Sequence, residues 1–74
     1  MSRRYTVVLA PDPEEGGFTV TVPALPGCVT EGDALEEALD NVRDAIRSLL
    51  AYLEESGKPI PEEKTAPQIV AVEV

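Results

Sequence analysis

The sequence has no histidine, a single cysteine and no tryptophan. Without histidine the chain cannot assemble a Ser-His-Asp or Cys-His arrangement for nucleophilic catalysis. One cysteine, Cys28, excludes an intramolecular disulfide, and with no histidine beside it a standard zinc site is excluded as well. In this chain of 74 residues we therefore expect no catalytic residue, no metal ligand and no cofactor, and a core built from aliphatic side chains.

Basic residues are also scarce, with six against 14 acidic residues and a formal net charge of −8. A charge of this sign repels phosphate backbones and anionic membranes, so direct binding to nucleic acid or to a membrane is not expected. The N-terminal residues lack the apolar stretch of a signal peptide, and no later run reaches the roughly 20 apolar residues of a membrane span. These patterns predict a cytoplasmic protein.

Alternating β-branched residues predict three short strands in the first half of the chain. Residues 5–10 and 18–22 alternate with a period of two and are separated by proline and glycine, which favours an antiparallel hairpin with a loop longer than two residues. One face of this hairpin is apolar and the other is rich in threonine. Residues 28–31 form a third strand, whose shortness favours the edge of a sheet.

Apolar residues then recur at spacings of three and four from Leu35 to Leu53, which predicts a long amphipathic helix. Asp33 and Glu36 have the spacing of a capping box and place its start at Ala34, while Ser56-Gly57 marks its end. Apolar residues 69–72 and Val74 predict a fourth strand. The expected fold is α+β, a β-β-β-α-β single sheet in one domain of residues 1–74, with the helix packed on one face.

The acidic residues allow two interpretations. Converging carboxylates could hold magnesium for phosphoryl chemistry, but these residues are spread over a turn and one face of the helix, where pairs such as Asp40 with Arg43 and Asp44 with Arg47 are expected. Cys28 is interpreted as a packing residue and Arg3 with Arg4 as a solvated pair. The acidic residues proposed to contact a partner are Glu14, Glu15, Glu36, Asp40 and Asp44.

Several runs of the sequence resemble the HicB-like antitoxin family. They are residues 5–9, 15–18, 22–33, 35–42 and 57–61, and the P-x-L-P-G-C-V-T-x-G-D run within them is the most specific. The resemblance implies a truncated ribonuclease H-like fold without nuclease activity, which binds and blocks HicA, a small basic toxin that cleaves messenger RNA. Active enzymes of that fold carry a metal-binding aspartate on the first strand, whereas residues 5–10 contain no acid.

Full-length antitoxins of this family commonly add a C-terminal DNA-binding domain, and we expect none in this chain. The leading hypothesis is a HicA-neutralising antitoxin, and the alternative is an orphan oligomeric or adaptor module of the same fold without a toxin partner. The uncovered threonine-rich face and the short edge strand also predict self-association, most simply as a homodimer.

Overall fold

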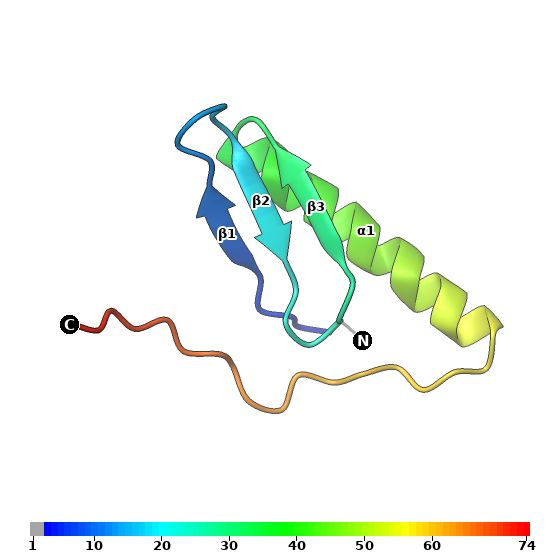
Figure 1. Cartoon of the computed structure of the whole chain (residues 1–74). Coiled ribbons are helices and arrows are strands. Elements are labelled where there is room, and N and C mark those ends of the chain that lie inside the picture. The colour runs from blue at the N-terminus through cyan, green and yellow to red at the C-terminus, as the bar shows by residue number, and fades with distance from the viewer. Residues whose placement is uncertain (1–2) are drawn as a thin grey trace.

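The computed structural model describes residues 3–74, which form one sheet and one helix (Figure 1). The strands are β1 (Val8–Pro11), β2 (Phe18–Thr21) and β3 (Val29–Gly32), followed by α1 (Leu35–Glu55). The sheet has the order β1-β2-β3, and both neighbouring pairs are antiparallel. The α+β class and the order of three strands and a helix are confirmed, although β1 begins three residues later than predicted.

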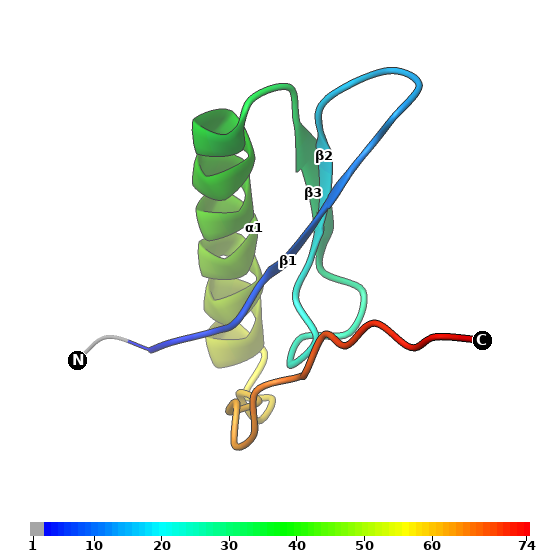
Figure 2. The ribbon, with the colours of Figure 1, turned by 90° about the vertical axis from the view of Figure 1, so that its left-hand side faces the viewer.

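The helix lies against one face of the sheet, so the molecule has two layers (Figure 2). Alternation along β2 turns Val20 into the core and leaves Thr19 and Thr21 exposed on the opposite face. Cys28 is 8% exposed and belongs to this core, which confirms its role as a packing residue. The buried cluster consists of Val20, Val22, Leu25, Cys28, Ala38 and Val42.

The helix ends as predicted but begins differently. At its C-terminus the Gly57 N–H donates to the Glu54 carbonyl (3.1 Å) and the Lys58 N–H to the Leu53 carbonyl (2.9 Å), a Schellman motif that Gly57 permits with φ of +66°. At the N-terminus Ala34 takes the cap position and no side chain caps it. The predicted Asp33–Glu36 capping box was therefore wrong.

The side chain that reaches back at this end is Glu37, one residue beyond the predicted Glu36. Its Oε1 accepts a hydrogen bond from the Asp33 N–H at 3.3 Å. The helix begins one residue later than the capping box required, at Leu35. A one-residue shift rotates the acceptor by about 100° around the helix, which brings Glu37 into place instead of Glu36.

Gly32 allows β3 and α1 to come into contact. A Cβ at this position would lie 2.5 Å from the Ala38 nitrogen and 2.7 Å from its Cα, both of which are backbone atoms that cannot move away alone. Ala38 is itself fully buried. The two small residues therefore set how closely the sheet and the helix pack.

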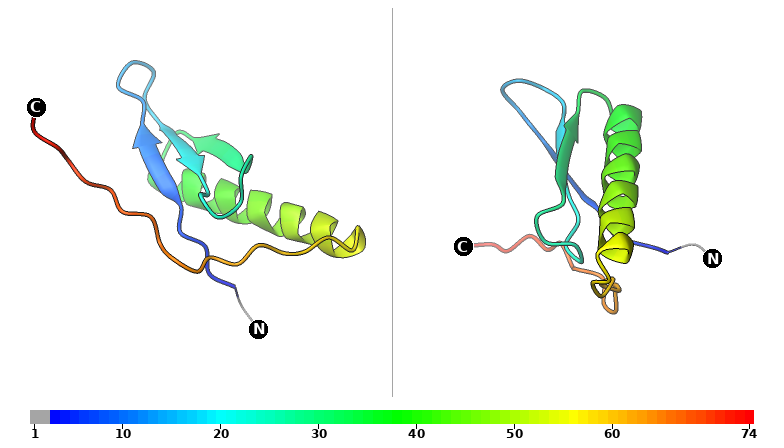
Figure 3. Two further views of the ribbon diagram at one scale, coloured as in Figure 1. Left: turned by 60° about the horizontal axis from the view of Figure 1, so that its bottom comes forward. Right: turned by 90° about the vertical axis from the view of Figure 1, so that its right-hand side faces the viewer.

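The predicted fourth strand is not formed. Residues 58–74 contain no helix or strand, and Ile69, Val70 and Val72 are 83%, 71% and 79% exposed. The Thr6 N–H and hydroxyl both donate to the Glu63 carboxylate, so the tail crosses the segment that leads into β1 instead of running beside the strand (Figure 3, left). A strand needs a neighbouring edge for its backbone hydrogen bonds, and beyond this contact the tail does not lie along the free edge of β1.

Candidate partner-binding surfaces

Two loops form an acidic end of the molecule. The β1–β2 loop and the β3–α1 loop lie at the same end of the sheet because the strands are antiparallel (Figure 1). Between them is a hollow of about 300 Å³. Its acidic lining residues are Asp12, Glu15, Glu31, Asp33 and Glu37.

The β1–β2 loop presents its acidic residues through a local turn. The Asp12 Oδ1 accepts hydrogen bonds from the N–H groups of Glu14 (2.9 Å) and Glu15 (3.2 Å), and the Gly16 N–H donates to the Asp12 carbonyl. The two bonds to its carboxylate favour the charged form and hold the pKa of Asp12 below its ordinary value. The turn thus keeps Glu14 and Glu15 on the surface beside an ionised aspartate.

The acidic residues of the helix form a stripe. Glu36, Asp40 and Asp44 are exposed and spaced by four residues, so they lie on one side of α1 and continue from the acidic end. Arg43 pairs with Asp40 at 3.2 Å and Arg47 pairs with Asp44 at 3.5 Å. Both predicted ion pairs are confirmed. They are exposed pairs, which contribute little stability but offset the charge of the two aspartates.

The structure thus distributes the five proposed contact residues over two places. Glu15 lines the acidic hollow with Glu14 beside it in the loop, while the other three extend along the helix. Sequence reasoning missed Glu31 and Glu37 and assigned Asp33 to a cap. The antiparallel order of the strands was the available signal, because it brings the two loops to one end.

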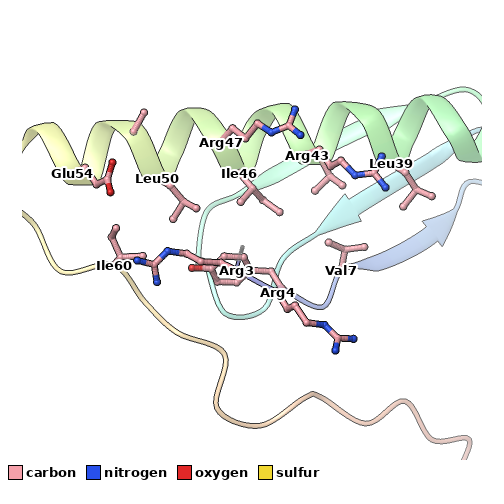
Figure 4. A pocket seen from close by; sticks show the side chains of 13 residues that line it. Arg3, Arg4, Val7, Leu39, Arg43, Ile46, Arg47, Leu50, Glu54 and Ile60 are labelled. Carbon is pink, nitrogen blue, oxygen red and sulfur yellow. The ribbon is translucent and has the colours of Figure 1, made fainter. Parts of the chain in front are cut away.

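A second surface lies along the helix, between α1 and the segment that leads into β1. It is a groove of about 750 Å³, and in Figure 4 Leu39, Ile46 and Leu50 point from the helix toward the segment that leads into β1. Four arginines line the same groove: Arg3, Arg4, Arg43 and Arg47. Sequence reasoning missed this surface, because the two pairs of arginines are 39 residues or more apart in the chain. We call it the arginine groove.

Among the described residues there is neither a cluster of metal ligands nor a membrane-spanning helix. In residues 3–74, no three histidine, cysteine, aspartate or glutamate side chains gather where they could hold a metal ion. Within the same range, no helix has the length and apolarity needed to cross a membrane. These residues present two hollowed surfaces, the acidic end and the arginine groove, on a two-layer domain.

Fold and surfaces together define a small acidic α+β domain with binding surfaces. The family described as the HicB-like antitoxin of bacterial toxin–antitoxin systems matches residues 5–73, and the chain belongs to this family. It is 43% identical over 60 residues to a UPF0150 protein of Thermoplasma acidophilum, a match that covers 81% of this chain and 86% of that protein. The family places the chain in the toxin–antitoxin class.

Two curated antitoxins are also similar. Antitoxin HicB 1 of Photorhabdus laumondii is 41% identical over 58 residues, which are 78% of this chain and 37% of that protein. Antitoxin HicB of Escherichia coli K12 is 34% identical over 58 residues, which are 78% of this chain and 41% of that protein. The match therefore covers less than half the length of either antitoxin.

Proposed function

We propose that this chain is an antitoxin that neutralises a HicA-type, messenger-RNA-cleaving toxin by binding it directly. The observation that carries the proposal is the family match over residues 5–73, which takes in every strand and the helix. Two proteins named as HicB antitoxins share 34% and 41% identity with it. Three statements belong to the proposal: that the toxin is of the HicA type, that binding of this chain blocks it, and that this chain catalyses no reaction.

The acidic end supplies a physical reason for binding a basic toxin. Opposite charges accelerate encounter, and this steering is screened over about 8 Å at physiological ionic strength. Glu14, Glu15 and Glu36 are exposed acids at or near this end, and we place them first among the contacts. Asp40 and Asp44 follow, because Arg43 and Arg47 already offset their charge.

Charge alone does not give specificity, so apolar contacts are needed to hold the complex once it forms. Interface charges mainly change the association rate, whereas desolvated contacts mainly set the dissociation rate. We therefore expect a complex whose formation slows with salt but whose lifetime changes less. The cytoplasmic location and the single-domain organisation stay predictions.

The deciding experiment is a calorimetric titration of a HicA-like protein encoded beside this gene, at low and at moderate salt, together with an RNA-cleavage assay. We expect saturable binding that is stronger at low salt and that stops cleavage. Binding that leaves cleavage intact, or no binding in either buffer, would reject the antitoxin function for this chain. The remaining hypothesis would then be an orphan oligomeric or adaptor module.

A further inference from the structure

The C-terminal tail, residues 68–74, is an exposed apolar segment that belongs to the domain. Ile69, Val70, Val72 and Val74 are all highly exposed large hydrophobic residues, and they lie within one run of six residues. The family match extends to residue 73 and so takes in all of this run except Val74. Four exposed branched side chains within six residues form a surface of the kind that another chain covers.

The tail cannot cover its own groove without releasing its anchor. The Tyr5 hydroxyl donates to the Pro61 carbonyl at 2.6 Å, and Thr6 donates from its N–H at 2.5 Å and from its hydroxyl at 2.7 Å to the Glu63 carboxylate. Beyond these contacts the chain leaves on the side of the sheet opposite the helix, whereas the arginine groove lies on the helix side (Figures 2 and 3).

The matching surface is the outer edge of β1 with the arginine groove beneath it. β1 is an edge strand of the sheet, and its neighbouring strand is β2. Leu39 and Leu50 line the groove but lie outside the residues that pack against the buried core. An exposed strand edge above an apolar groove is suited to an added strand, which gains backbone hydrogen bonds and side-chain burial together.

We propose that residues 68–74 of a second copy of this chain lie along the edge of β1 and cover the arginine groove, and that the exchange is reciprocal in a twofold dimer. In an extended strand Val70, Val72 and Val74 share one face. This face packs against Leu39, Ile46 and Leu50 of the other copy. Pro11 has no N–H to donate, so the added strand pairs with β1 before that residue.

Twofold symmetry allows both tails and both grooves to be used in the same dimer. Each copy gives one tail and receives one, so both sets of exposed valines and both grooves are buried in a closed assembly. This interface is separate from the threonine-rich face of the sheet, and it leaves the acidic end accessible. The proposal concerns the purified chain alone and does not depend on the proposed toxin.

Single substitutions test which surface is used. Sedimentation equilibrium of the whole chain is expected to give a dimer, and Val72→Lys is expected to raise its dissociation constant about tenfold or more, because one buried valine is lost from each contact. Val29→Lys is the matched control, since Val29 is 59% exposed on β3 and should leave the constant unchanged. A monomer at all concentrations, or a dimer weakened by Val29→Lys but not by Val72→Lys, would overturn the proposal.

A mixing experiment separates exchange between copies from closure within one copy. A tail variant, Val70→Lys/Val72→Lys, and a groove variant, Leu39→Lys/Leu50→Lys, are each expected to be monomeric with the helical circular dichroism retained. Mixed, they should form a one-to-one heterodimer, seen by native mass spectrometry, because one intact tail then meets one intact groove. Folded variants that stay monomeric when mixed would contradict the exchange.

Discussion

The acidic end and the arginine groove are built from the same helix and differ in almost every other respect. The acidic end consists of carboxylates from two loops, the end of β3 and the first turn of α1. The groove gathers four of the six basic residues of the chain around leucine and isoleucine side chains. The net charge of −8 is therefore unevenly distributed over the surface, because the acidic end carries carboxylates without arginines, whereas the groove combines four arginines with apolar side chains and Glu54.

The two surfaces also differ in what fixes them. Gly32 packs against Ala38 at the acidic end, and the Asp12 turn orders the adjoining loop. The groove is bounded by one helix and the segment before β1, with only partial burial of Ile46 and Leu50. The acidic end is thus part of the packed fold, whereas the groove has side chains that further burial would stabilise.

The largest effect is expected from Gly32→Ala. The added Cβ would overlap the Ala38 backbone, and separating β3 from α1 should cost about 3 kcal/mol of unfolding free energy. Gly57→Ala is the control, because that position has open space and only a positive φ, with an expected cost of about 1 kcal/mol. Urea denaturation measures both variants. Equal losses of unfolding free energy in the two variants would show that Gly32 is not packed tightly against Ala38.

A smaller effect is expected from removing charge at the acidic end. Glu14→Gln/Glu15→Gln should slow association with a HicA-type toxin about fivefold at low salt, because it removes two exposed acids that form no ion pair among residues 3–74. Asp40→Asn/Asp44→Asn removes the same net charge. Because these residues are already paired with Arg43 and Arg47, this variant should slow association with the toxin less. Stopped-flow measurements compare them, and equal slowing would mean that the partner responds to net charge alone.

The smallest effect concerns Glu63, which anchors the tail next to the groove. Hydrogen bonds from the Thr6 hydroxyl and N–H, with a further contribution from the charge of Arg4, hold the pKa of Glu63 below its ordinary value of 4.5. A lowered pKa in the folded state means that the ionised group stabilises the fold above that ordinary value. This contribution is lost as the pH falls through the folded-state pKa.

The unfolding free energies of wild type and Glu63→Gln should therefore differ at pH 6 and converge toward pH 3. Denaturant titrations at the two pH values measure this difference. Glu62→Gln removes the same charge one residue away, and its difference from wild type should change less with pH. A difference for Glu63→Gln that is the same at both pH values would contradict the anchoring role of the ionised carboxylate.

Local patterns predicted most of the fold and part of the candidate site. The helix period, the glycine at its end, the two i,i+3 ion pairs and the packing role of Cys28 depend on neighbours within a few residues, and all are confirmed. The capping box failed because the helix began one residue later than its spacing required. The groove was missed because Arg3 and Arg4 meet Arg43 and Arg47 only after the chain folds.

The sequence by itself determined which segments are apolar, which are acidic and which favour a helix or a strand, because these properties follow from composition and periodicity. It also determined that residues 69–74 favour an extended conformation. Only the tertiary structure decided that this segment pairs with no strand of its own copy, where Glu63 contacts Thr6 and the tail leaves away from β1. Strand pairing depends on which edge a segment reaches, and that is set by contacts between residues distant in the chain.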